Sequence, residues 1–437
     1  MTTLHTPLQS GTAEQESWRD RFKITRTTVF SVLFILLGVW ILLSAAQSFE
    51  ADTATTLTYG RSPDGTILST VVTIIPYLTV VAILYIASGT VSLLPVEPLQ
   101  RARFWLLLLC GALIFPTVLI VAAAGQSTNA TSMLASSLRL ATPIVIGALA
   151  GIWCERSGVV NIAIEGMMLS GAAFGFIAFT LLAPLMNSET AIFLGVIIAV
   201  LAGGLMAVLH AWLSITFKTD QIVSGTVINI LALGLTSFMR REVLLQQADA
   251  GRETLQALPI PVLADIPVLG EVFFTGKPIF YMMFVLLILT HVMLFYTRWG
   301  LRTRAVGENP HAADTLGINV IRNRWINVII GGCIAGLAGA WLSLETTGTF
   351  DDNMTAGRGF IALAAMIFGK YLPFGALGGG LLFGFSSALE TRFQILGVNL
   401  PPQFLQMTPY LVTIIVLAGL VGRATPPKAD GVPYEKE

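Results

Sequence analysis

Long apolar runs recur along nearly the whole chain, and short polar segments separate them. Each run is long enough for a helix to cross the hydrocarbon core of a bilayer, which is roughly 30 Å thick. The pattern therefore predicts an all-α fold, a polytopic transmembrane helical bundle of about twelve spans. The predicted spans are 28–47, 67–91, 104–124, 136–153, 158–183, 191–214, 221–239, 278–297, 326–345, 357–370, 374–391 and 405–422.

The composition supports a membrane protein and argues against other classes. Hydrophobic residues make up 54% of the chain and charged residues 11%, whereas soluble domains carry roughly 25% charged residues. The formal net charge is zero, so the charge balance does not predict a nucleic-acid partner. The three cysteines lie in or beside apolar segments without a CxxC pair, which indicates neither a disulfide framework nor a metal site.

Basic residues between the predicted spans indicate the orientation of the chain. They concentrate in 1–27, in alternate loops and in 298–325. By the positive-inside rule, this distribution predicts that both termini lie in the cytoplasm. The 240–277 loop is also partly basic, but we assign it to the outside because a long loop can translocate regardless of its charge. The charged leader before the first span is longer than the n-region of a signal peptide, which favours an uncleaved anchor.

The predicted spans fall into two groups. Segment 28–125 follows the cytoplasmic N-terminal tail (1–27) and holds no strongly polar residue in mid-span, so we interpret it as accessory transmembrane helices. The core, 132–422, contains glycine pairs at four-residue spacing, which let helices approach closely. Residues 423–437 form a cytoplasmic C-terminal tail. Near the end of the core, glycines and Pro373 interrupt two apolar segments, as is frequent in substrate pathways.

The core also shows a weak internal repeat. A shift of 199 residues aligns Gly158 with Gly357 and Met167 with Met366. Apolar helices produce such matches by chance, so a two-repeat core remains a hypothesis. Under this shift Glu165 falls opposite an alanine, and the carboxylate would then serve one half of the core only.

An amide and a carboxylate lie in the apolar run that begins at Gly158. Asn161 and Glu165 are four residues apart, which places them on one face of a helix. A charge facing hydrocarbon costs about 2.5–3.5 kcal/mol, so we expect Glu165 to face the protein interior. Two roles remain open: a hydrogen bond to a neighbouring helix, such as the one carrying Asn229, or contact with a passing ligand. Asn161, Glu165, Asn229 and Phe360 are the candidate residues of the substrate pathway.

The polar, basic segment 298–325 is too hydrophilic to span a membrane. Within it, Asn309 can cap a helix whose first residue is Pro310, where the missing N–H costs nothing. Gly317 can end that helix in a left-handed conformation. The sequence thus predicts a short helix at 311–316, held by flanking loops at the inner face of the membrane, where a soluble partner can act on it.

Sequence motifs for an energy source or for catalysis are absent. The chain has no GxxxxGK[ST] loop with which to bind ATP and no HExxH motif. The four histidines are scattered, and we expect His210, inside an apolar span, to be a hydrogen-bonded core residue.

Several stretches together carry a family resemblance. "ERSGVVNIAIEGMML", "LRTRAVGENPHAADTLGI", "IAGLAGA" and "RGFIALAAMIFGKYLPFGALGGGLLFG" resemble, in this order, the membrane permease subunit of bacterial ABC importers. The resemblance covers 132–422 and is closest to the nucleoside branch, which is related to simple-sugar and branched-chain amino-acid permeases. "HAADTLG" is similar to the E-A-A-x-x-x-G loop through which importer permeases contact their ATPase. Ala312, Ala313 and Gly317 match that loop, and His311 stands where the family has Glu.

The resemblance implies a transport subunit, not an enzyme, that carries nucleosides across the bacterial plasma (inner) membrane and needs no cofactor of its own. Its implied partners are an ABC ATPase at Asn309, Ala312, Ala313 and Gly317, a second permease (a paralogue or a second copy), an extracytoplasmic substrate-binding lipoprotein and the lipid bilayer. A simple-sugar or branched-chain amino-acid permease remains an alternative. So does an ion-coupled secondary transporter, for which Glu165 is the sole deep carboxylate in the sequence, and a membrane enzyme, for which the spans offer few polar groups.

Overall fold

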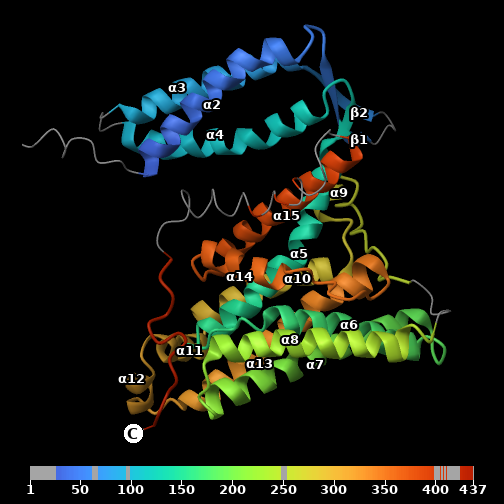
Figure 1. Cartoon of the computed structure of the whole chain (residues 1–437), viewed down its shortest axis with the longest axis vertical. Helices are drawn as coiled ribbons and strands as arrows, with labels where there is room; N and C mark the ends of the chain where they lie inside the picture. The colour runs from blue at the N-terminus through green and yellow to red at the C-terminus, as the bar shows by residue number, and fades with distance from the viewer. Residues whose placement is uncertain are drawn as a thin grey trace, which may run out of the picture. The chain divides into compact units, whose positions relative to one another are not determined.

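A computed structural model describes residues 26–61, 67–94, 99–247, 253–397 and 424–436, together with Phe404, Met407 and Tyr410 (Figure 1). These residues belong to two compact units, one within 1–55 and 72–124 and the other within 56–71 and 125–437. The predicted N-terminal tail up to residue 25 lies outside the described residues. The predicted span 405–422 also does, except for Met407 and Tyr410.

In the first unit, the described residues form the helices α2 (Arg26–Ser48), α3 (Ile74–Leu93) and α4 (Leu99–Ala122). Glycines bring α2 and α3 into close contact. A methyl group added at Gly38 would come within 2.8 Å of the Ala82 carbonyl oxygen, and one added at Gly89 within 2.7 Å of the Ser31 carbonyl oxygen. Side chains on the outward faces, such as Trp40, stay apolar and exposed, as suits helices surrounded by lipid.

A small sheet was not predicted from the hydrophobic pattern. Strand β1 (Ala54–Arg61) lies between β2 (Ile67–Thr73) and β3 (Ser127–Asn129), and its Thr56 pairs with Ser127 in a parallel register. The predicted span 67–91 is therefore wrong in its first seven residues, because the helix begins only at Ile74. The Thr, Val and Ile residues of 67–73 are β-branched and favour extended chain.

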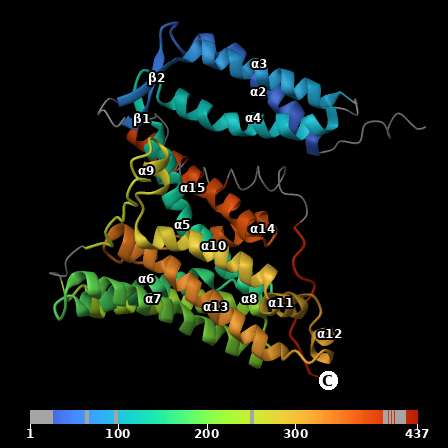
Figure 2. The same cartoon turned by 180° about the vertical axis from the view of Figure 1, so that it is seen from behind.

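The second unit is a bundle of long helices (Figures 1 and 2). Short π-helical segments, η1 to η3, extend three of them. The elements are α5 (Ala130–Glu155), α6 (Ile164–Leu182), α7 (Ser188–Ala211), η1 (Trp212–Thr216), α8 (Gln221–Met239), η2 (Arg240–Leu244), α9 (Leu269–Phe273), α10 (Pro278–Tyr296), α11 (Arg298–Glu308), α12 (Pro310–Thr315), α13 (Val320–Ala340), η3 (Trp341–Thr347), α14 (Arg358–Phe368) and α15 (Pro373–Ile395).

Helices α5, α6 and α13 form the buried centre of this unit. The predicted glycine pairs allow close packing here: a methyl group at Gly171 on α6 would come within 2.5 Å of the Gly336 carbonyl oxygen on α13. His210 on α7 is fully buried, and its Nε2 lies 3.0 Å from the Val160 carbonyl oxygen. The prediction of a hydrogen-bonded core histidine is confirmed.

Within the described part of the chain, nine helical segments have the length and apolar composition needed to cross a membrane. This confirms the predicted class, a polytopic helical membrane protein. Helix α14 has 11 residues, too few to span a bilayer alone. It is followed by a break, after which Pro373 starts α15. The predicted interruption between 357–370 and 374–391 is therefore present.

The 199-residue shift matches the backbone at one point only. Gly158 and Gly357 both have a φ of 82°. However, α14 begins directly after Gly357, whereas α6 begins only at Ile164. The two-repeat core stays a prediction.

Candidate functional site

Glu165 lies in the first turn of α6 and is 7% exposed. Its Oε1 accepts a hydrogen bond from the Gly357 amide at 2.7 Å, and its Oε2 accepts one from the Gly359 amide at 2.5 Å. These amides stand at the beginning of α14, where backbone N–H groups have no partner within the helix and the helix dipole favours a negative charge. Glu165 therefore caps α14 from a different helix.

Close packing between the starts of α6 and α14 restricts which residues fit at this cap. The N-cap of α14 is Gly357, which has no side chain to cap the helix. At Gly359, an added Cβ would come within 2.6 Å of the backbone nitrogen and Cα of Glu165. The start of α14 is thus in backbone contact with the start of α6, and only glycine fits there.

Asn229 on α8 binds the same turn of α6. Its Oδ1 accepts a hydrogen bond from the Gly166 amide at 2.8 Å, and its Nδ2 donates to the Ile162 carbonyl oxygen at 3.0 Å. Two sets of hydrogen bonds therefore connect three helices. Asn229 on α8 binds the chain at the start of α6, and Glu165 on α6 binds the start of α14.

The predicted common helix face of Asn161 and Glu165 is wrong. Residues 158–163 are not helical, because the chain turns at Gly158 before α6 begins. Asn161 is fully buried, and its Nδ2 donates to Cys154 Sγ at 3.2 Å. Phe360, on α14, is 49% exposed. The structure thus brings Asn229 and Glu165 to one turn and separates Asn161 from them, and the pathway role of all four residues stays a prediction.

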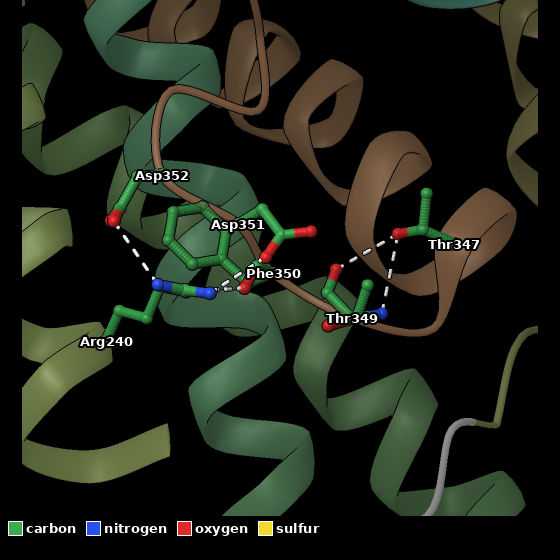
Figure 3. A network of polar contacts seen from close by, with 6 residues as sticks. All are labelled: Arg240, Thr347, Thr349, Phe350, Asp351 and Asp352. Atoms are coloured by element: carbon green, nitrogen blue, oxygen red, sulfur yellow. Dashed lines mark hydrogen bonds and ion pairs between the residues drawn. The ribbon is translucent and has the colours of Figure 1, made fainter. Parts of the chain in front are cut away.

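The loop that leads into α14 is held at its other end by Arg240 (Figure 3). The guanidinium pairs with Asp351 at 2.9 Å and with Asp352 at 3.2 Å, and its Nε donates to the Phe350 carbonyl oxygen at 3.2 Å. Arg240 was predicted in a loop but stands in η2, which continues α8. The segment 350–359 is therefore held at its first residues by Arg240, in the continuation of α8, and at its last residues by Glu165 on α6.

A cavity of about 470 Å³ lies near the start of α5, at the opposite end of that helix from Glu155. Its volume is within the range of small-molecule sites, about 300–1,000 Å³. Its walls combine two aromatic rings with hydroxyl and charged groups. The lining residues are Ser132, Met133, Ser136, Arg139, Leu140, Ala257, Thr275, Lys277, Phe280, Trp341, Glu345, Thr346, Ala388, Thr391, Arg392 and Ile395. Sequence reasoning missed this site because its residues come from five separate segments.

Glu345 in this cavity repeats the arrangement of Glu165. It is 3% exposed, and its carboxylate accepts hydrogen bonds from the amides of Ile279 at 2.6 Å and Phe280 at 3.2 Å, in the first turn of α10. Burial lowers the pKa of the nearby Lys277 amine, and the charge of Glu345 opposes that shift. From its sequence, Glu165 was predicted to be the sole deep carboxylate of the chain. Glu345, at the end of a predicted span, is buried in the protein to a similar extent.

The predicted capped helix is α12. It begins at Pro310, directly after its predicted cap Asn309, and ends at Thr315, one residue before the predicted end. Asn309 Oδ1 accepts a hydrogen bond from the Ala312 amide at 3.1 Å, Pro310 is the first helical residue, and Gly317 has a φ of 79°. Ala312 is exposed and Ala313 is buried. The segment before α12 was predicted as a loop but forms α11.

A polytopic helical bundle with a short capped helix and a polar cavity fits a membrane transport protein. Comparison with known families specifies it further. Residues 133–417 match the family described as the permease component of branched-chain amino acid transport systems. The chain belongs to this family of ABC transporter permeases.

Individual relatives of the chain are also ABC transporter permeases. The chain is 43% identical over 308 residues to the nucleoside ABC transporter permease NupC of Lactococcus lactis, covering 70% of this chain and 96% of the relative. It is 42% identical over 307 residues to the guanosine permease NupQ of Bacillus subtilis, covering 69% and 95%. NupP, a second guanosine permease of Bacillus subtilis, is 26% identical over 260 residues, covering 57% and 70%. No solved structure matches the chain.

Proposed function

We propose that this protein is the transmembrane subunit of an ATP-driven importer and that it carries nucleosides into the bacterial cell. The observation that carries the proposal is the similarity to a nucleoside permease and a guanosine permease over nearly their whole lengths. The cavity near the start of α5 supports it. Phe280 and Trp341 contribute apolar wall that is suited to contact with a nucleobase, and the hydroxyl groups of Ser132 and Ser136 are suited to hydrogen bonds with ribose.

The orientation follows from the charge distribution. Basic residues cluster around α11 and α12, which by the positive-inside rule puts this end in the cytoplasm together with both chain termini. The cavity then opens to the outside. An external lipoprotein delivers the ligand on that side, and residues 253–277, beside the cavity, are the surface that it would meet.

Two further partners are proposed. An ABC ATPase binds the segment 309–317, which contains the stretch similar to the ATPase-contacting loop of importer permeases and presents Ala312 on its exposed side. This partner would supply the phosphate-binding loop that the chain lacks. A second permease completes the pathway. Bacillus subtilis has two permeases named for guanosine, and both resemble this chain, which supports a paralogue over a second copy.

Reconstitution in proteoliposomes tests the proposal. The chain alone should show no ATP hydrolysis, and nucleoside uptake should require ATP and the added ATPase, second permease and binding protein. Glucose and leucine should not compete. Trp341→Ala should raise the KM for nucleoside by about tenfold through lost apolar contact with the ligand, while Trp212→Ala, outside the cavity, should not. Uptake driven by an ion gradient without ATP, or competition by leucine or glucose, would contradict the proposal.

A further inference from the structure

The C-terminal segment 424–436 lies beside α11 and α12 (Figures 1 and 2). Tyr434 is 7% exposed and forms a small core with Val306 of α11, Ala313 of α12 and Val320 of α13. Its ring centroid lies 5.2 Å from that of His311. The buried side of α12 therefore packs against a residue from the far end of the chain.

A second set of contacts fixes the tail to the bundle. Arg324 on α13 is 2% exposed and donates to the carbonyl oxygens of Val432 at 2.9 Å and Ala429 at 3.5 Å. The Ala429 amide donates to the Gly307 carbonyl oxygen at 2.9 Å. At Gly158, an added methyl group would come within 2.9 Å of Arg324 Nη2 and 3.1 Å of the Ala429 carbonyl oxygen. The turn between α5 and α6 is thus shaped to admit the tail.

Asp430 joins the tail to the end of α5. Its carboxyl group is a close neighbour of the Glu155 carboxyl group and of the Arg324 guanidinium. Burial raises the pKa of Asp430 to about 7, against the opposing effects of these neighbours. The tail therefore links α12, through Tyr434, to α5 and α13, which run through the centre of the bundle.

The six-residue helix α12 is too short to hold its shape or position by itself. A displacement of α12 by a bound partner is transmitted to the transmembrane helices through the elements that pack against α12. We propose that the tail, residues 424–436, is part of the element that couples this permease to its ATPase, and that Tyr434 is the positioning residue for α12. This inference rests on the proposed function, in which α12 receives the ATPase.

The test measures ATPase affinity for the permease pair in lipid nanodiscs. Tyr434→Ala should raise the Kd for the purified ATPase about tenfold, whereas Tyr434→Phe, which keeps the ring, and Lys436→Ala, an exposed tail control, should stay within about twofold of wild type. In Tyr434→Ala, amide hydrogen exchange should accelerate in 310–317 and not in α6. Binding of the external lipoprotein should be unchanged, which separates positioning from general loss of structure.

Two further variants keep the outcomes distinguishable. Ala312→Asp changes the exposed face of α12 directly. If it weakens ATPase binding while Tyr434→Ala does not, the tail inference is overturned and the proposed function stands. If neither change weakens binding, α12 is not the ATPase contact. A chain ending at Gly431 removes Tyr434 but keeps the Ala429 and Asp430 contacts, and should behave as Tyr434→Ala does. Wild-type ATPase affinity in that chain would also overturn the inference.

Discussion

Glu165 offers a quantitative test of why a carboxylate lies in an apolar segment. It caps α14 with two hydrogen bonds to backbone amides, so Glu165→Leu leaves both N–H groups without their partner at a largely buried position. Glu165→Gln keeps the shape but has one acceptor oxygen, and its NH₂ group would face the second N–H. The two variants should therefore differ in degree.

The expected loss can be worked from these contacts. A hydrogen bond to a charged group contributes about 1.5–3 kcal/mol. Glu165→Leu should therefore lower the free energy of unfolding by about 3–6 kcal/mol. Glu165→Gln should lower it by about 2–5 kcal/mol, because one bond remains but its acceptor is neutral and contributes only about 0.5–1.5 kcal/mol.

Thermal and denaturant unfolding in nanodiscs would measure both losses, with Glu189→Gln as a matched control at the exposed start of α7. Hydrogen exchange should show the largest change at the first turn of α14. If the carboxylate also contacts passing ligand, Glu165→Gln should lose more nucleoside uptake than its stability predicts. A Glu165→Leu variant as stable as wild type would refute the capping account.

Three other changes test separate parts of the structure. Gly317→Val should weaken ATPase binding, because a β-branched residue at a φ of 79° adds strain of about 1–3 kcal/mol to α12, whereas Gly317→Asn, which tolerates this conformation, should bind nearly normally. The ordinary pKa of Asp430 is 3.8, and its pKa in the docked tail is about 7. Between these pH values the docked tail retains a proton that the released tail gives up. Docking of the C-terminal tail should therefore weaken as pH rises from 3.8 to about 7, and it should change little at higher pH. Hydrogen exchange of 429–434, corrected for intrinsic rate, should therefore be faster at pH 7.5 than at pH 6, and Asp430→Asn should reduce the difference. Arg240→Ala should lower the free energy of unfolding by only about 1 kcal/mol, since the ion pairs of Arg240 are partly exposed. High salt should reduce this difference from wild type. An unchanged Tm at low salt would argue against a role for Arg240 and its two aspartates in holding the loop before α14.

Local patterns determined much of this protein. The apolar runs were enough to establish a helical membrane bundle, because a bilayer leaves few other ways to satisfy backbone hydrogen bonds. The cap of α12 by Asn309 and the left-handed Gly317 were also predictable, since each depends on residues within a few positions of one another. Strand β2 was assigned to a span because β-branched apolar residues fit a span and a strand equally well. Strand β1 lies between two predicted spans, and the hydrophobic pattern carried no signal for it.

Only the tertiary structure decided which distant groups meet. The sequence indicated that Glu165 needs a compensating partner, but the partner is a pair of backbone amides about 190 residues away, and an amide carries no signal in the sequence. Asn161 lies before α6, because the chain turns at Gly158 and the helix begins only at Ile164. The hydrophobic pattern alone does not determine at which residue of an apolar run the helix begins. Neither the capping of α10 by Glu345 nor the packing of Tyr434 under α12 has a sequence pattern, since both depend on contacts between segments that the chain separates widely.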